Sequence, residues 1–301
     1  MPIRIPKDLP ARTILEREHI FMMDDEAKTY AGMRPLSILL LNLMPLKEDT
    51  ETQLLRAMSH TILPVEVTFM TTATHASTHT SAEHMEKFYV TFDAVKERTF
   101  DGMIITGAPI EHYEFEEVDY WPELVEIMNW ANDHVNSTLH LCWGAQAALY
   151  YFYGIRKYPI SEKISGIFEH KTQNQTEALL RGFGDTFPCP HSRHTEVRET
   201  EIKEHPELKV LATSEEAGVL LVMNADGSQI FLQGHPEYDR DTLAKEYERD
   251  YKKGMDPNVP SHYYVNDDPA TIPPLTWRNV ATTLYTNWLN YYVAKGFLEG
   301  E

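Results

Sequence analysis

The sequence predicts an α/β fold in which a doubly wound, mostly parallel sheet carries helices on both faces. Short runs rich in β-branched and aliphatic residues alternate with longer amphipathic stretches, as in repeated strand–helix units. Several of the short runs are apolar on both faces, which is typical of buried parallel strands. Ligands of such sheets bind at the carboxyl ends of the strands, so residues that follow the strands are the first candidates for a functional site.

The expected strands are the short apolar runs. They are Leu36–Leu43, Val65–Met70, Met103–Thr106, Thr138–Cys142, Lys209–Ala212, Val219–Met223 and Gln229–Leu232. The expected helices are the longer stretches with helical periodicity. They are Asp49–Ser59, Ala82–Val95, Trp121–Asn132, Ala145–Tyr153, Arg240–Lys253 and Trp277–Lys295.

Two segments do not follow this alternation. Residues 1–33 contain prolines and many charges without a clear period, so we expect an arm packed on the body, with regular structure beginning at Arg34. The polar stretch His191–Pro206 is dense in His, Arg and Glu and is expected to be a loop or lid. Length alone allows one large domain or two modest ones, and we interpret residues 34–301 as a single α/β domain.

The charge balance restricts the partners of the protein. Lys and Arg number 27 against 46 Asp and Glu, which gives a formal charge of −19. This charge opposes nonspecific attraction to nucleic acid or to an anionic membrane surface. An anionic co-substrate would need a local basic patch or backbone N–H groups to hold it.

Cysteine usage and the N-terminus indicate a cytoplasmic protein. Cys142 and Cys189 are the two cysteines, too few for a disulfide scaffold. The N-terminus has no continuous apolar core of a signal peptide, and Leu36–Leu46 is too short to span a bilayer. No metal is expected, because the histidines lack the paired short spacings of a zinc site. Those histidines are His112, His191, His194 and His205.

The first chemical candidate is Cys142, which lies where an expected strand meets an expected helix. Trp143 and Gly144 follow it, and the helix begins at Ala145. A thiol at a sharp strand-to-helix turn is held out of the sheet, and the adjacent helix N-terminus favours its thiolate. Cys142 therefore has the position of a nucleophile, although a lone cysteine here can also be a small buried apolar residue.

The second candidate is the sequence Gln-Gly-His-Pro-Glu, which directly follows the strand residues Ile230–Leu232. In extended backbone, residues two apart face the same side, so His235 and Glu237 can lie together. The carboxylate can then orient the imidazole. Alone, this segment is also compatible with a surface turn. Together with Cys142 it supplies a nucleophile, a base and an orienting carboxylate, which form a triad by role.

At these residues the sequence resembles two related groups of enzymes. The segments HLCWGAQAAL and QGHPE are similar to the Cys and His-x-Glu elements of class I glutamine amidotransferases, which have a flavodoxin-like α/β sheet. A closer resemblance, nearly end to end, is to the succinyltransferase-type homoserine O-acyltransferases of methionine biosynthesis, which share this fold. It is carried by MPIRIPKDLPA at the start, LLNLMPLKEDTETQLLR at 40–56, TGAPIEHYEFEEVDYW at 106–121, HLCWGAQAALYYFYGI at 140–155 and QGHPEYDRDTLAKEY at 233–247.

The resemblance implies a two-step acyl transfer. Cys142 would take an acyl group from coenzyme A as a thioester and hand it to the hydroxyl of L-homoserine, with His235 as base and Glu237 orienting it. Acetyl-CoA would be a co-substrate, with no permanently bound cofactor. The family also implies that residues matching Lys163 and Ser192 contact substrate.

Further site residues follow from the same resemblance. An arginine matching Arg249 holds the carboxylate of the amino acid in the family, and a homodimer is the family expectation. The position of Glu111 resembles an acyl selector, since glutamate there accompanies acetyl-CoA and glycine accompanies succinyl-CoA. The sequence therefore predicts acetyl transfer, with succinyl transfer as the alternative.

Acyl transfer also needs hydrogen-bond donors for a tetrahedral oxyanion. The N–H of Trp143, the residue after the nucleophile, is one donor by the geometry of the elbow. We expect the second in the turn Pro45–Lys47. Because Pro45 has no N–H, Leu46 or Lys47 would supply it.

Two other functions use the same residues. A glutaminase would direct the triad at a carboxamide, but the chain has no second synthase domain, and Gly107-Ala-Pro-Ile-Glu-His replaces the glycine-rich turn of an amidotransferase. The other alternative is a noncatalytic small-molecule binding protein on the same sheet. Slow iodoacetamide labelling of Cys142 without strong pH dependence would favour that alternative.

Overall fold

The computed structural model describes residues 3–23, 29–30, 32–75 and 79–295 of the 301-residue chain. Parts of the expected arm, residues 1–2, 24–28 and 31, lie outside the described residues. The strands are β1 (Ile3–Arg4), β2 (Leu36–Leu41), β3 (Val65–Met70), β4 (Tyr89–Val90), β5 (Phe100–Ile105), β6 (Val135–Leu141), β7 (Tyr158–Thr172), β8 (Thr186–Glu196), β9 (Leu208–Ser214), β10 (Gly218–Asn224) and β11 (Gln229–Leu232).

The helices follow the strands in repeated order. They are α1 (Pro10–Arg17), α2 (Lys47–Met58), α3 (Ala82–Phe88), α4 (Trp121–His134), α5 (Trp143–Tyr153), α6 (Glu199–Lys203), α7 (Thr242–Lys252) and α8 (Arg278–Trp288). Shorter helical turns are η1 (Phe92–Ala94), η2 (Phe115–Glu117), η3 (Ala178–Leu180), η4 (Val265–Asp267) and the π-helical η5 (Leu289–Val293). No helix among the described residues is long and apolar enough to cross a membrane.

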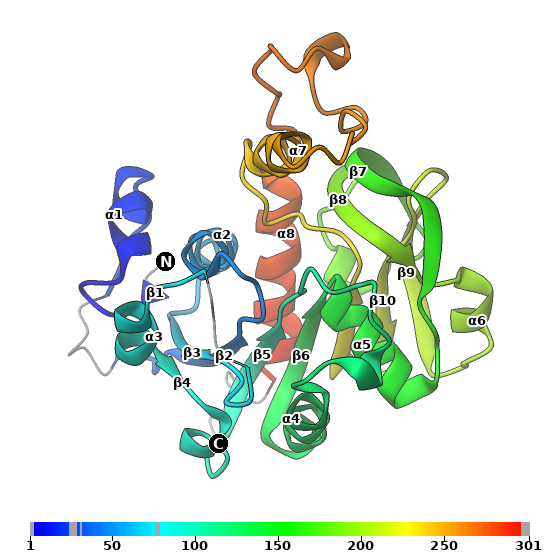
Figure 1. Ribbon diagram of the computed structural model, residues 1–301. Helices are drawn as coiled ribbons and strands as arrows, with labels where there is room; N and C mark the ends of the chain where they lie inside the picture. Colours follow the sequence, from blue (N-terminus) through cyan, green and yellow to red (C-terminus); the bar gives the residue numbers. More distant parts are fainter. Residues whose placement is uncertain (1–2, 24–28, 31, 76–78, 296–301) are drawn as a thin grey trace.

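The described strands form one mixed sheet in the order β1-β3-β2-β5-β6-β11-β10-β9-β7-β8, with β4 beside β3 (Figure 1). The pairs from β1 through β6 to β11 are parallel. Beyond β11 the pairs are antiparallel. The expected doubly wound, mostly parallel α/β fold is therefore confirmed, and the antiparallel strands extend it on one side.

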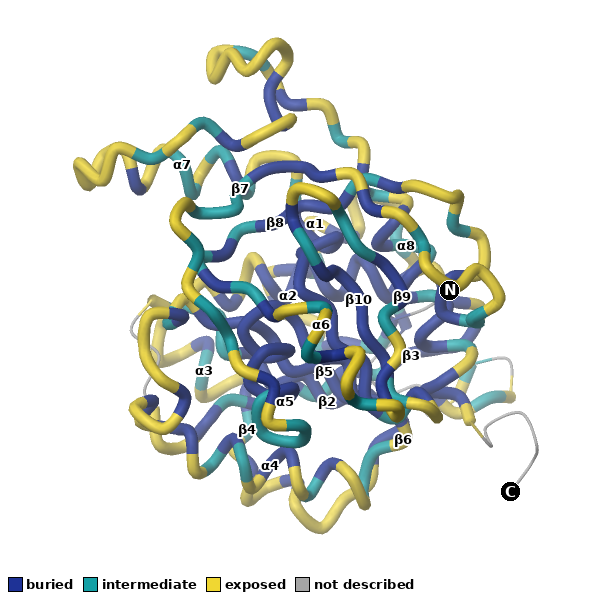
Figure 2. Tube along the Cα trace, turned by 90° about the vertical axis from the view of Figure 1, so that its right-hand side faces the viewer, coloured by how far each residue is buried: buried dark blue, intermediate teal, exposed yellow. Residues whose placement is uncertain are grey.

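Helices cover both faces of the parallel strands, and each face has its own hydrophobic core. One core packs α1, α2 and α8 against the sheet, with Leu54, Leu284 and Trp288 fully buried or nearly so. The other packs α4 and α5, with Leu124 and Leu149 fully buried. Figure 2 shows the buried residues running through the central strands, while much of the segment between α7 and α8 is exposed.

Regular structure begins well before Arg34, so that expectation was wrong. Ile3 pairs with Val65 of β3, so β1 stands at one end of the strand order of the sheet. Helix α1 packs on α2, and just beyond α1 the carboxylate of Glu18 forms an ion pair with Arg56 at 2.5 Å. A strand of two residues is too short to give a period-two pattern, which explains why periodicity did not reveal it.

The prediction of a loop or lid at His191–Pro206 is also wrong. Its first part belongs to β8, which pairs antiparallel with the long strand β7, and its second part contains α6. Polar side chains along β7 and β8 obscured the strand pattern. Strands with one solvated face can carry many polar residues, and here the buried residues of β8 themselves include His191 and Arg193.

Two helix boundaries also differ from expectation. The segment Ala82–Val95 is not one helix, because α3 ends at Phe88 and the chain then forms β4 and η1. Aromatic and β-branched residues at 88–92 favour the extended backbone found there. The last expected helix is divided into α8 and the π-helical turn η5.

Candidate active site

Cys142 lies at the carboxyl end of β6 and is the N-cap residue of α5. Its φ of 48° and ψ of −114° are unfavourable for a side-chain-bearing residue, as a sharp elbow requires. Its N–H donates to the carbonyl of Leu232 at 2.7 Å, which ties the elbow to the end of the neighbouring strand β11. The expected arrangement of a strand, Cys142 and a helix is thus present, and Cys142 is 5% exposed.

Gly144 explains how the helix can begin so abruptly. A β-carbon at this position would lie 2.6 Å from the carbonyl oxygen of Thr106 and 3.0 Å from that of Ile105. The first turn of α5 therefore packs directly on the backbone at the end of β5. Any larger residue at 144 would push the elbow away from the sheet.

His235 and Glu237 lie beside this elbow because β11 and β6 are parallel neighbours, with Leu232 paired to Leu141. The Nδ1 atom of His235 is 2.7 Å from Oε1 of Glu237, and both side chains are buried. Cys142 lies close enough to His235 to raise the pKa of its imidazole. The structure therefore brings together the three residues expected to form the triad.

The surroundings of His235 hold the imidazole and favour its charged form. Its ring stacks on Tyr238 with centroids 4.2 Å apart, and the backbone N–H of His235 donates to the carbonyl of Pro190 at 2.8 Å. Burial acts to lower the pKa of His235, but the charges and hydrogen bonds of Glu237 and Cys142 raise it well above its ordinary value. The site therefore favours a protonated imidazole at His235, next to the side chain of Cys142.

Lys163 and Ser192 meet at Glu246, which sequence reasoning did not identify. The Nζ atom of Lys163 lies 3.2 Å from Glu246, and the Ser192 hydroxyl donates to the same oxygen. Tyr238, the residue stacked on His235, donates its hydroxyl to the other oxygen at 3.2 Å. Glu246 therefore links two of the expected substrate-binding residues to the triad.

Arg249 lies one helical turn after Glu246 on α7. Its Nε–H donates to Asp250 at 2.7 Å, and Asp250 also lies 3.7 Å from Lys163. The guanidinium is half exposed and carries further N–H donors that could reach a ligand carboxylate. The spacing of three residues from Glu246 is the signal in the sequence that places both side chains on one face of a helix.

Glu111 is buried beside β8 and not solvated in its acidic loop. One carboxylate oxygen accepts a long hydrogen bond of 3.4 Å from the N–H of His194. Burial raises the pKa of Glu111, while His194, Lys163, His112 and His235 act in the opposite direction. The Glu111 carboxylate thus lies within the range at which the charges of Lys163 and His235 act on it.

Gly107, just beyond the end of β5, lies against the elbow. A β-carbon at Gly107 would lie 3.2 Å from Cβ of Cys142 and 3.5 Å from the backbone nitrogen of Trp143. Leu46 caps α2 with its side chain exposed, and Lys47 is buried, with Nζ donating to the carbonyl of Asn42 at 2.5 Å. Burial lowers the pKa of Lys47 to about 8.

A cavity of about 510 Å³ opens beside this region, between the turns that follow β2 and β5. Residues 108–110 and 117–120 form one wall, and residues 42–45 with Lys47 form another. Pro45 and Lys47 of the turn expected to supply an oxyanion donor border this hollow, whereas Cys142 and Trp143 are not among its lining residues.

The histidines have varied positions, and no group of three or more His, Cys, Asp or Glu among the described residues could hold a metal ion. His191 and His170 are buried, with Nε2 atoms 3.0 Å apart, and burial lowers the pKa of each. His112 lies against His194, and His205 against Tyr153.

The fold and this arrangement define a class of α/β proteins with a cysteine elbow beside a His–Glu pair. Solved structures support the fold. A glutamine amidotransferase from Thermotoga maritima matches with a TM-score of 0.57 at 14% identity, covering 86% of this chain and 98% of that one. A glutamine amidotransferase from Methylobacillus flagellatus matches with a TM-score of 0.52 at 14% identity, covering 89% and 96%. These likenesses establish the fold.

The family follows from the sequence comparisons. Residues 2–297 match the homoserine O-succinyltransferase family. The homoserine O-acetyltransferase of Lachnoclostridium phytofermentans is 59% identical over 97% of both chains. That of Agathobacter rectalis is 56% identical over 97% of this chain and 94% of its own. The chain belongs to the homoserine O-succinyltransferase family, and the protein is accordingly an acyltransferase.

Proposed function

We propose that the protein transfers an acetyl group from acetyl-CoA to the hydroxyl of L-homoserine, giving O-acetyl-L-homoserine and CoA in methionine biosynthesis. The observation that carries the choice of acetyl is Glu111, a carboxylate buried near His235 and Lys163. A succinyl chain would bring a second carboxylate to this place, whereas an acetyl group adds no charge. The relatives are named homoserine O-acetyltransferases, which agrees with this choice, although the family takes its name from succinyl transfer.

The chemistry proceeds in two half-reactions on Cys142. The thiolate attacks the thioester carbonyl of the donor, the tetrahedral intermediate collapses, and CoA leaves as its thiol after taking a proton from His235. The neutral imidazole then removes the proton of the homoserine hydroxyl as its oxygen attacks the enzyme thioester. Glu237 keeps the Nδ1 proton of His235 in place and stabilises the imidazolium in both steps.

The oxyanion is stabilised by backbone donors. Trp143 supplies one N–H from the first turn of α5. We assign the second to the Gly107–Ala108 segment in preference to Leu46 or Lys47, because the close approach of Gly107 to Cys142 and Trp143 supports it. Lys47 instead supports the neighbouring turn through the carbonyls of Asn42 and Met44.

Homoserine binds between α7 and the β7–β8 hairpin. Arg249 pairs with its carboxylate, and the carboxylate of Glu246 is suited to its ammonium group. Lys163 and Ser192 hold Glu246 in the free enzyme. We propose that the protein is cytoplasmic and forms a homodimer. It needs no permanently bound cofactor.

The test of the proposed function is product analysis of the purified protein with homoserine and either acetyl-CoA or succinyl-CoA. We expect O-acetylhomoserine as the main product. Release of ammonia from glutamine, without either acyl product, would favour the glutaminase alternative.

Arg249→Ala should weaken the binding of homoserine far more than the binding of acetyl-CoA. A guanidinium can form two hydrogen bonds with the amino-acid carboxylate, and the loss of such a charged pair costs roughly 2–3 kcal/mol, or about 30- to 150-fold in KM. Acylation of Cys142 by acetyl-CoA should be unchanged. Lys252→Ala is the matched control, because Lys252 lies on the same helix and pairs with exposed Glu248. Equal losses in both half-reactions of Arg249→Ala would contradict the assignment.

A further inference from the structure

The loop of residues 107–117 separates two parts of the site. Ile110 and Tyr113 line the 510 Å³ cavity, whereas Glu111 between them is turned toward His194 of β8. Among the described residues, one hydrogen bond holds the side chain of Glu111 on the β8 side, and at 3.4 Å it is long for an N–H···O bond. The position of its carboxylate therefore depends on how firmly the backbone of the loop is held.

Lys157 holds that backbone from the segment between α5 and β7. Its Nζ atom donates to the carbonyl of Glu111 at 2.5 Å and to the carbonyl of Tyr113 at 2.5 Å. An ammonium group that bridges carbonyls two residues apart fixes the direction of both peptide groups. The side chain of Lys157 is partly buried. Lys157 is not among the site residues predicted from the sequence.

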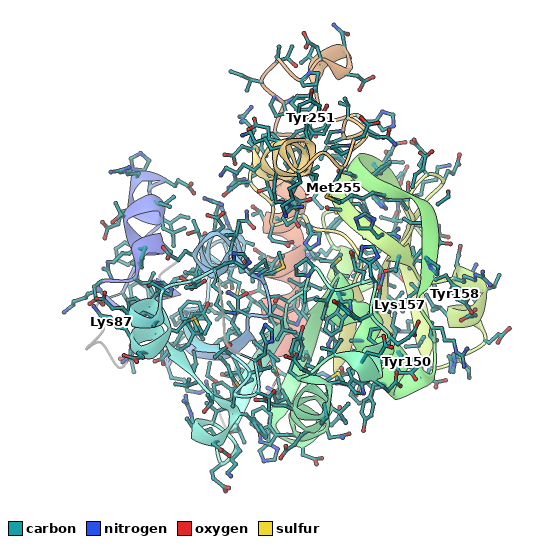
Figure 3. All side chains as sticks on the ribbon, in the orientation of Figure 1. Lys87, Tyr150, Lys157, Tyr158, Tyr251 and Met255 are labelled. Carbon is teal, nitrogen blue, oxygen red and sulfur yellow. The ribbon has the colours of Figure 1, made fainter. Side chains whose placement is uncertain are left out.

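The same ammonium group connects the loop to the helix of the nucleophile. It lies 5.1 Å from the ring centre of Phe115, at a distance suited to a cation–π contact. The ring of Phe115 stacks on Tyr150 of α5 and lies 5.7 Å from that of Trp143. Figure 3 labels Lys157 and Tyr150 in this region. Movement of Lys157 would thus loosen the loop relative to the elbow.

We propose that Lys157 is a positioning residue for the choice of acyl donor: it holds the backbone at Glu111–Tyr113 so that the Glu111 carboxylate stays where a charged acyl chain is repelled. The inference rests on the proposed acyl transfer and assigns part of its selectivity to a residue that touches neither the acyl group nor Cys142. Without the clamp, the loop can shift and the carboxylate can turn away from the acyl group.

The experiment compares Lys157→Met, which keeps the length of the side chain and removes the donors, with Lys157→Arg, which retains donors. Lys171→Met is the control, since Lys171 is exposed and pairs only with exposed Glu215 among the contacts described for it. Rapid-quench mass measurement gives the rates of acylation by acetyl-CoA and by succinyl-CoA. Amide hydrogen exchange reports separately on residues 110–115.

We expect Lys157→Met to reduce the preference for acetyl-CoA over succinyl-CoA by about tenfold or more, as misplacement of a selecting group does. Exchange of the loop amides should become faster, and KM for homoserine should not change. Lys157→Arg should recover most of the preference, and Lys171→Met should behave as the wild type.

Two results would overturn the inference separately from the proposed function. A wild-type enzyme that is acylated normally, together with a Lys157→Met variant of unchanged donor preference, would remove Lys157 from selection. Unchanged amide exchange in that variant would show that Lys157 does not hold the loop. A wild-type protein that takes no acyl group from either donor would instead refute the proposed function, and the selective role of Lys157 with it.

Discussion

Glu237→Gln should lower acyl transfer by about 10⁴-fold while leaving the fold intact. An amide donates a proton toward Nδ1 of His235 instead of accepting one, so the imidazole takes the wrong tautomer and cannot act as base through its other nitrogen. The substitution preserves shape, and Oε2 of Glu237 is buried without a hydrogen-bond partner. Steady-state rates with acetyl-CoA and homoserine measure the loss, and thermal unfolding checks the fold.

The matched control for this variant is Glu215→Gln, an exposed carboxylate far from the site in sequence and paired with exposed Lys171. It should retain wild-type rates. His235→Ala should be at least as damaging as Glu237→Gln, because the alcohol then has no base. Wild-type turnover in Glu237→Gln would remove Glu237 from the triad even though it lies 2.7 Å from His235.

Glu111→Gly should convert the donor preference. Two carboxylates about 4 Å apart repel by about 4 kcal/mol at the effective dielectric of a partly buried site. That energy corresponds to roughly a thousandfold discrimination against succinyl-CoA. Glycine removes both this repulsion and the steric conflict, so the variant should gain succinyl transfer while its acetyl transfer falls. Competition between the two donors, followed by product analysis, measures the ratio.

Glu97→Gly is the control for Glu111→Gly, because it removes an exposed carboxylate from a turn outside this loop. Its donor preference should stay that of the wild type. A wild-type enzyme that prefers succinyl-CoA would contradict the assignment of acetyl transfer. An unchanged preference in Glu111→Gly would place selection elsewhere in the pocket.

The parallel part of the fold could be predicted because its strands are buried on both faces. Val65–Met70 and Gln229–Leu232 have the expected boundaries, and the elbow at Cys142 lies between a strand and a helix as expected. Apolar composition determines such strands almost alone. The hairpin of β7 and β8 could not be predicted, since its strands carry Lys, Glu, His and Arg whose burial depends on tertiary partners.

In the site too, local contacts could be predicted from the sequence, and contacts between distant segments could not. His235 and Glu237 are two residues apart in sequence, so their contact follows from local geometry and was predicted. Glu246 and Lys157 act through residues more than 40 positions away in sequence, and a single sequence carries no signal for such pairs. The sequence predicts the second oxyanion donor at Leu46 or Lys47, because the strand before this turn is expected to end beside the elbow. The close approach of Gly107 becomes visible in the structure.

The central claim is that Cys142 carries the acyl group, and intact mass after brief exposure to acetyl-CoA tests it most directly. We predict a mass increase of one acetyl group, located on Cys142 by peptide mapping and lost on addition of homoserine. Cys189→Ser should take the label normally, because Cys189 is buried and its thiol pKa is raised well above the ordinary value by burial. Cys142→Ser should form no thioester. A label on Cys189, or normal turnover of Cys142→Ser, would contradict the mechanism.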